Sequence, residues 1–168
     1  MKHTSPNHHQ ILTNLSALPR KILSAYDAKN LSQLVLHDLC DEHCFNIPKA
    51  IYLVDNPDFN CLNGIAGFQK EKKYPDNAWE NPEKFSQFIQ AHPLHQKVRS
   101  FSSASLSSDN QQKELDSIAQ AFDLSNPHFY IFGMKNDNQG IVLFEQPKQP
   151  LDDLLHSFSL LGFCPLHS

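Results

Sequence analysis

Apolar residues recur along the chain at two spacings, and the changes between them divide it into predicted helices and strands. Helical spacing runs from Leu15 to Tyr26 and then from Asn30, a favourable N-cap, through Cys44. Residues 1–13 are rich in His, Asn and Ser and have no apolar period. We therefore expect a flexible N-terminal tail over residues 1–13 and one domain over residues 14–168.

Strand-like runs follow these helices. Ala50–Val54 and Cys61–Phe68 lie close enough to pair as a hairpin, and Asn56-Pro57-Asp58 breaks the chain between them. The two strongest strand signals are His128–Met134 and Ile141–Glu145, joined by a short polar segment. Another strand is expected over Val98–Ser102.

Three further helices are predicted. The first starts at Asn81 and ends before Pro93, the second covers Asp109–Phe122, and the third starts at Pro150 and ends at Gly162. The predicted fold is therefore α/β (α+β), a central antiparallel sheet of about five strands with helices on both faces. The helices from the two chain ends should cover one face, and those from the middle the other.

This order of elements resembles the GAF family of small sensory domains, from about Leu15 onward. A PAS-like or profilin-like sheet is the alternative, because it has the same helix and strand content. The stretches that carry the resemblance are the helix Leu31–Cys44 leading into Ala50–Asp55, the strand end Gly64-Ile65-Ala66-Gly67, the hairpin His128–Glu145 and the helix Leu151–Phe158.

The resemblance implies a regulatory input module. Such domains bind a small molecule, a metal or a partner domain beneath their middle helices, often dimerise through their terminal helices, and in some cases form the N-terminal input domain of bacterial enhancer-binding transcription activators. The chain departs from several subfamilies. It lacks the Asn-Lys-Phe-Asp-Glu set of cyclic-nucleotide binders, a bilin-attaching Cys-His pair, and any cysteine between residues 69 and 163.

Composition narrows the class of partner. The net charge is −4, with 14 basic and 18 acidic residues, which argues against direct binding of nucleic acid. No apolar run is long enough to cross a membrane, and the first residues do not resemble a signal peptide. We therefore expect a cytoplasmic protein with reduced cysteines and no membrane association.

One cluster has the composition of a metal site. His37, Cys40, Asp41 and Cys44 follow one side of a predicted helix, and three of them could reach one zinc or iron ion. Cys40 also belongs to the apolar side, and no second cluster lies nearby in the sequence. A buried cysteine beside a solvated polar face explains the pattern, so no metal and no cofactor are predicted.

No motif typical of a catalytic nucleophile, phosphate loop or metalloprotease is present, and no catalytic residue is assigned. Gly64 and Gly67 are interpreted as strand irregularities. A ligand is instead expected between the sheet and residues 77–98, where mobile segments would cover a rigid face. The predicted lining residues are Tyr52, Trp79, Phe88, His92, His95 and Tyr130.

Two functions fit these patterns. The first is a regulatory or sensory domain that binds a small molecule or a partner protein, and the second is a ligand-free module for interaction or dimerisation; a small enzyme is the less favoured alternative. A homodimer through the terminal helices is expected, because Leu34 and Leu160 would otherwise point away from the sheet.

Overall fold

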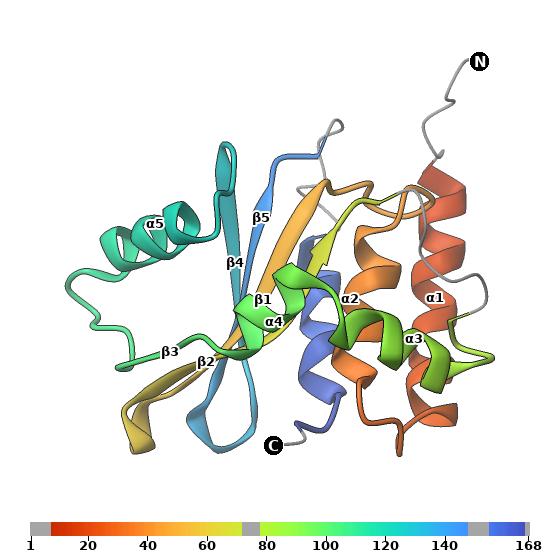
Figure 1. Ribbon diagram of the computed structural model, residues 1–168, viewed down its shortest axis with the longest axis horizontal. Helices are drawn as coiled ribbons and strands as arrows, with labels where there is room; N and C mark the ends of the chain where they lie inside the picture. Colours follow the sequence, from red (N-terminus) through yellow and green to blue (C-terminus); the bar gives the residue numbers. More distant parts are fainter. Residues whose placement is uncertain (1–7, 72–77, 148–154, 167–168) are drawn as a thin grey trace.

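The computed structural model describes residues 8–71, 78–147 and 155–166 and contains one five-stranded sheet (Figure 1). The strands lie in the order β3-β2-β1-β5-β4, and every neighbouring pair is antiparallel. Their bounds are β1 Lys49–Asn56, β2 Cys61–Gln69, β3 Ser102–Ser103, β4 Pro127–Gly133 and β5 Gln139–Glu145.

Helices cover both faces of this sheet, which confirms the predicted fold class (Figure 1). None of the helices in the described part of the chain is long and apolar enough to span a membrane. The helices are α1 His8–Ser24, α2 Leu31–Cys40, α3 Pro82–Gln90, α4 Pro93–Arg99 and α5 Gln111–Ala121, and the 3-10 helices are η1 Pro57–Phe59, η2 Lys135–Asp137 and η3 Leu155–Phe163.

Alternation along β1 separates two cores. Ala50, Tyr52 and Val54 pack with α1, α2 and η3, whereas Ile51 and Leu53 pack with α4 and α5. The chain ends and the middle of the chain therefore cover opposite faces, as expected. Helix α3 belongs to neither layer on the sheet. Its two buried residues form a third cluster with α2, made of Leu34, Ala78, Phe85 and Ile89.

The N-terminal boundary differs from the prediction. Helix α1 begins at His8, so residues 8–13, which were expected in the flexible tail, are helical; residues 1–7 lie outside the described part. The reason is Ile11, which extends the buried stripe of Leu15, Leu18 and Ile22 by one turn. Within a polar stretch, the adjacent pair Ile11 and Leu12 shows no helical spacing by itself.

Helix α2 ends at Cys40 and not at Cys44. Asp41 has extended backbone, and Asn46 is in the left-handed region with φ 53°. The N–H groups of Phe45 and Ile47 donate to the carbonyls of Leu39 and Cys40, so the chain reverses at once into β1. Burial of Phe45 and Ile47 fixes this turn.

The strand predicted over Val98–Ser102 does not form as expected: Val98 and Arg99 end a helix, and only Ser102 lies in a strand. Helix α4 runs to Arg99, and β3 keeps only two residues, which pair with Leu62 and Asn63. Pro93 occupies the first turn, the N-cap His92 accepts a hydrogen bond from the N–H of Leu94, and the helix buries Leu94 and Val98 four residues apart. The start of the last predicted helix lies outside the described residues, and residues 155–163 form the 3-10 helix η3.

Two glycines of β2 bring α4 close to the sheet. A bulge leaves Ile65 between Gly64 and Ala66, as expected from the glycines. A Cβ on Gly64 would lie 1.8 Å from the carbonyl oxygen of Val98, and one on Gly67 would lie 3.0 Å from Val98 Cγ2. Only glycine at position 64 lets α4 lie this close, and this contact places the polar side of α4 beside α2.

Candidate functional site

The six residues predicted to line a ligand site are distributed over separate regions. Tyr52 is fully buried, stacks on Phe132 at 6.1 Å and places its hydroxyl 3.7 Å from Met134 Sδ. Tyr130 packs against the same core and stacks on Phe132 at 6.3 Å. Both tyrosines therefore lie on the sheet face opposite α4 and α5, and the expectation that they border a site beneath the middle segment is wrong.

Trp79 and Phe88 lie with the helices instead of over the sheet. The indole Nε1 of Trp79 donates to the Asp38 carboxylate at 2.9 Å, and the Lys21 ammonium lies 3.0 Å from the same oxygen and 5.6 Å from the indole centroid. Phe88 packs against the cluster around α3, with its ring 6.2 Å from that of His92. Neither residue lies beneath α4 on the sheet.

The two histidines of α4 are both buried but differ in role. His92 Nε2 lies 2.6 Å from a Glu71 carboxylate oxygen, while its Nδ1 accepts from the N–H of Leu94, so this ring caps the helix. His95 is 7% exposed and lines a cavity. Of the predicted residues, His95 is the one that contributes to this cavity.

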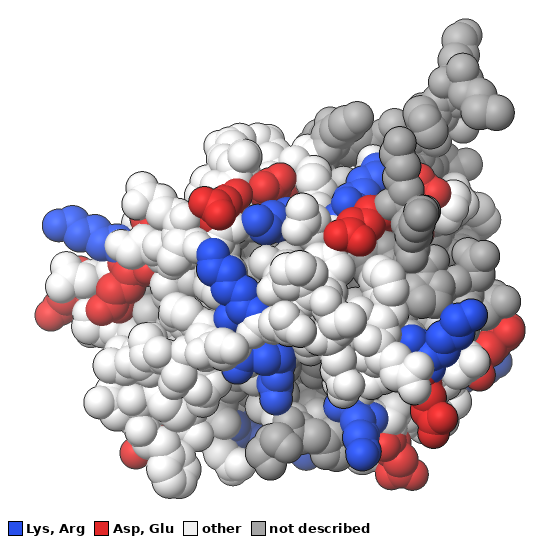
Figure 2. All heavy atoms as spheres, in the orientation of Figure 1, with Lys and Arg blue, Asp and Glu red and all other residues white. Residues whose placement is uncertain are grey.

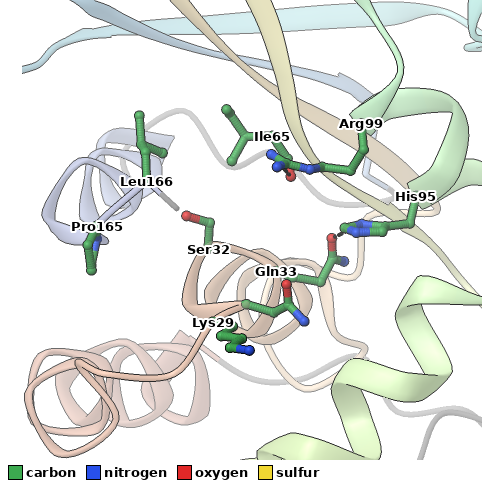
Figure 3. A pocket seen from close by; sticks show the side chains of 9 residues that line it. Lys29, Ser32, Gln33, Ile65, His95, Arg99, Pro165 and Leu166 are labelled. Carbon is green, nitrogen blue, oxygen red and sulfur yellow. Dashed lines mark hydrogen bonds between the residues drawn. The ribbon is translucent and has the colours of Figure 1, made fainter. Parts of the chain in front are cut away.

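The cavity lies between the start of α2, the bulge of β2, the end of α4 and the C-terminal residues Pro165 and Leu166 (Figure 3). Its volume is about 40 Å³, room for about three water molecules. In Figure 3 the labelled side chains surround this space, with His95 and Arg99 entering from α4 and Leu166 from the opposite side. Its lining residues are Lys29, Asn30, Ser32, Gln33, Ile65, His95, Arg99, Pro165 and Leu166.

A buried hydrogen-bond network forms one wall. Gln33, 2% exposed, donates from Nε2 to the carbonyl of Gly67 at 2.6 Å and accepts from the N–H of Gly67 at 3.1 Å. The same Oε1 lies 2.8 Å from His95 Nδ1. Gln33 thus joins α2, β2 and α4, and it satisfies backbone groups of β2 beyond the two residues that pair with β3.

The electrostatic character of the cavity is positive. Lys29 and Arg99 line it, and the described residues of the lining include no carboxylate. The first turn of α2 adds the partial positive charge of a helix start, and that turn contains no acidic residue. Figure 2 shows basic side chains over the middle of the face where Figure 1 places α4, with most acidic side chains farther out. Such an arrangement favours a small anion.

A second hollow, of about 210 Å³, lies between α1 and α2. Its charges are paired within it, since Lys21 meets Asp38 at 3.0 Å and Asn14 donates to the carbonyl of His43 at 2.7 Å. The Asp41 carboxylate accepts from the N–H of His43. This hollow is larger, but it offers a ligand less uncompensated charge.

The four metal candidates do not form a site. In the described part of the chain, no group of three or more His, Cys, Asp or Glu side chains is arranged to hold a metal ion. His37 packs edge-on against Phe68 and Phe85, at 5.6 and 5.4 Å, and burial lowers its pKa. Burial also raises the pKa of the Cys40 thiol, and that of Cys44 to about 12, so both stay protonated at neutral pH.

Sequence reasoning missed every lining residue except His95, among them the polar residues Lys29, Gln33 and Arg99. Each reads as an ordinary polar position on or beside a helix, and they come together only because α4 approaches β2 and α2. The one local signal was the pair Gly64 and Gly67, since glycines in a strand mark close backbone approach.

Comparison with known proteins identifies no family model that matches this chain and no similar curated protein. Among solved structures, the chain is similar to the phycocyanobilin-bound GAF domain of a cyanobacterial phytochrome, with a TM-score of 0.49 and 11% identity over 95% of this chain and 92% of that one.

A phycoerythrobilin-bound GAF domain from a cyanobacterial phytochrome gives a TM-score of 0.49 and 10% identity, again over 95% of this chain and 92% of that chain. Escherichia coli SdiA gives 0.41 and 18% identity over 88% of this chain and 64% of SdiA. GAF domains are thus among the similar structures. Similarity at this level assigns no ligand and no activity.

Proposed function

We propose that this chain is a regulatory or sensory domain that binds a small anion in the cavity between α2, α4 and the C-terminal residues. The observation that carries the proposal is the lining itself, in which the exposed Lys29 and the buried His95 lie at a space with no described carboxylate, beside Arg99, whose Nη1 donates to the carbonyls of Gly64 and Ile65. The regulatory role is the one implied by the GAF-like pattern of the sequence.

The dimensions of the cavity limit the ligand. A space of about 40 Å³ suits a carboxylate or phosphate group of a few heavy atoms and excludes a nucleotide or a tetrapyrrole. Pro165 and Leu166 form one wall, so an occupant would contact the C-terminal residues as well as α2 and α4. Ligand binding would hold these segments together, as expected of a domain that converts occupancy into a change of shape.

A thermal-shift titration tests the proposal, because a ligand that binds only the native state must raise its stability. Formate, acetate, glycolate, phosphate and sulfate are compared at constant ionic strength with sodium chloride as reference. At least one anion should raise Tm in a saturable way. The Lys29→Gln variant should weaken binding about tenfold, consistent with loss of one charge-assisted contact.

The matched control is Arg20→Gln, which removes one positive charge from an exposed position of α1 outside the cavity. It should leave anion binding unchanged. No stabilisation by any of the five anions beyond that of chloride would contradict the proposal, and so would an equal loss of affinity in Arg20→Gln and Lys29→Gln.

We also propose a homodimer through α1, although not for the reason first given. Leu34 is buried beneath α3, and Leu160 packs partly buried against the main core, so neither residue calls for a partner. Leu12 and Leu23 lie on one side of α1 and are 45% and 76% exposed, and Tyr26, just beyond the end of that helix, is 52% exposed.

Pairing of two α1 helices would bury these side chains. Such a dimer is compatible with a ligand-binding domain and with a ligand-free interaction module. Light scattering at tens of micromolar should report a dimer, and Leu23→Glu should give a monomer. A monomeric wild-type protein would contradict this part of the proposal while leaving the anion site unaffected.

A further inference from the structure

The two edges of the sheet differ in how their backbone groups are bonded. At the β2 edge only two residues pair with β3, and side chains satisfy groups beyond them. Gln33 bonds to the carbonyl and the N–H of Gly67 at 2.6 and 3.1 Å. Arg99 Nη1 lies 3.4 and 3.5 Å from the carbonyls of Gly64 and Ile65. These bonds leave little for another strand to bind, and natural sheets protect their edges by such coverage.

The opposite edge is β4, whose bonding alternates along the strand. The N–H of Met134 donates to the carbonyl of Asn138 at 2.8 Å, so Met134 directs its backbone groups at the β5 side of the hairpin. In an antiparallel pair successive residues point to opposite sides, so the even-numbered residues of β4 bond to β5. A bond from the N–H of Lys70 to the carbonyl of Pro48, at 2.8 Å, sets the same alternation from the far side of β1.

The odd-numbered residues after Pro127 therefore direct their N–H and C=O groups away from the sheet, and we call them the outward residues: Phe129, Ile131 and Gly133. In the described part of the chain, no other segment hydrogen-bonds to their backbone groups. The usual protections of an edge strand are also missing, because β4 has no Lys, Arg, Asp or Glu and no shift of register against β5. The outer edge of β4 is thus open to another strand.

We infer that β4 pairs antiparallel with β4 of a second copy, about a two-fold axis at Tyr130. In this register Phe129 of each copy lies opposite Ile131 of the other, and the two residues exchange both backbone hydrogen bonds. The N–H of Gly133 reaches the carbonyl of Pro127, so the missing N–H of that proline is the only unmatched donor. Each copy thus supplies the groups that the other lacks.

The side chains suit the same register. Phe129 is 38% exposed, while Ile131 is partly buried against the core beneath α4 and α5. Both lie on one face of β4, so the opposed pairs would cover Phe129 and extend this core across the two-fold axis. No charged side chain of β4 is brought against a like charge.

This contact is separate from the pairing of α1 helices proposed above, since β4 is a sheet edge and α1 covers a sheet face. It is also the weaker contact, because one seven-residue strand from each copy buries little area. We expect a Kd of about 0.5 mM, so that at tens of micromolar the α1 contact decides the mass of the particle.

Amide hydrogen exchange of the wild-type protein, followed by NMR at about 50 µM and about 2 mM, tests the inference. The outward residues should exchange fast in the dilute sample and about threefold more slowly in the concentrated one. Amides of the even-numbered residues, which bond to β5, should exchange slowly in both. Fast exchange of the outward amides at both concentrations would overturn the inference. Slow exchange at both would also overturn it, since another segment of the same chain would then cover the edge.

Sedimentation equilibrium on the Leu23→Glu variant, which lacks the α1 contact, gives a second test. This variant should be monomeric at tens of micromolar and dimerise with a Kd of about 0.5 mM. Adding Phe129→Lys should weaken that association at least tenfold, because it places two charges at the paired edge. Phe59→Lys is the matched control, since Phe59 is 79% exposed in η1 and not in β4. No association up to about 2 mM, or equal association with either lysine, would overturn the inference and leave the anion site unaffected.

Discussion

Two hollows in the described part of the molecule differ in charge as well as in size. The larger, between α1 and α2, has a volume of about 210 Å³, and its Lys21, Asp38 and Asn14 are paired with groups in or beside it. The smaller, between α2 and α4, has about 40 Å³ and is lined by Lys29, Arg99 and His95 with no carboxylate among the described lining. The first is a satisfied surface cluster, whereas the described lining of the second carries positive charge and no carboxylate.

Volume alone is therefore a poor guide to a binding site. Polar groups that pair with one another stabilise the fold, but they gain little from a ligand, which would have to replace bonds already made. A lining whose described charges are all positive can gain from an anion more than a cluster whose charges already pair with one another. Changes that affect one region and spare the other therefore test the comparison.

The largest effect is expected from Gly64→Ala. The new Cβ would overlap the carbonyl oxygen of Val98, so α4 must move away from β2 and take His95 and Arg99 with it. We expect a loss of about 3 kcal/mol in the free energy of unfolding, as for overpacking against rigid backbone. Glycolate binding should be abolished, while the cluster around Asp38 remains intact. Urea denaturation and calorimetry measure both effects.

Gly133→Ala is the matched control. A Cβ at Gly133 would meet no atom within 4 Å, and its backbone is not in the left-handed region. This variant should be close to wild type in stability and binding. If Gly64→Ala behaved like Gly133→Ala, the close approach of α4 to β2 would not be needed for the cavity.

The next largest effect is a pH dependence of the free energy of unfolding, caused by His95 at the smaller cavity. His95 has a pKa of about 4 in the folded protein, against 6.5 for the ordinary side chain. Between these values the unfolded chain takes up a proton that the native protein does not, so acidification favours unfolding. Stability contributed by the neutral ring, up to about 3 kcal/mol, should be present above pH 6.5 and lost as the pH falls toward 4.

Burial also lowers the pKa of His37, so part of the dependence will come from that ring. Urea denaturation at pH 7.5 and 4.5 should show a smaller difference for His95→Gln than for wild type. The control is His8→Gln, at an exposed position of α1. Equal pH dependence in the two variants would show that His95 is not held neutral in the folded protein.

The smallest effect is expected in the other hollow. Asp38 accepts from Trp79 Nε1 and Lys21 Nζ, with side-chain exposures of 23% for Asp38 and 42% for Lys21. Asp38→Ala should lower stability by about 1 kcal/mol, since the contacts are partly solvated. It should also shift the emission of Trp79, the single tryptophan of the chain.

The same variant should bind glycolate as tightly as wild type does, because the contacts of Asp38 lie outside the cavity. Asp116→Ala, on the exposed side of α5, serves as the control for removal of a carboxylate. A loss of anion binding in Asp38→Ala alone would show that the two hollows are coupled.

The sequence predicted most of the architecture because the strands carry dense runs of β-branched and aromatic residues, as in Ile141–Glu145. It failed at α4, where Leu94 and Val98 are the main apolar signal in a seven-residue helix, too little to establish a helical period. It also failed for Tyr52, because alternation shows that Tyr52 and Ile51 lie on opposite faces but not which helices cover each face.

The site was less predictable for a related reason. Its lining comes from four separate segments, residues 29–33, 65, 95–99 and 165–166, and only His95 was expected there. Patterns of apolar residues show which side of an element is buried. They do not show which polar side chains of different elements come together outside the core. Tyr52 and Tyr130 were predicted because aromatic residues often line pockets, but both pack in the core.

The most direct test of anion binding in the smaller cavity is a titration of the isotope-labelled protein with glycolate, followed through backbone amide resonances. We expect saturable shifts at Lys29, Gln33 and His95, with little change at Asp38 and His43 in the larger hollow. Shifts concentrated around Asp38 and His43, or no saturable shift at any residue that lines the smaller cavity, would contradict it.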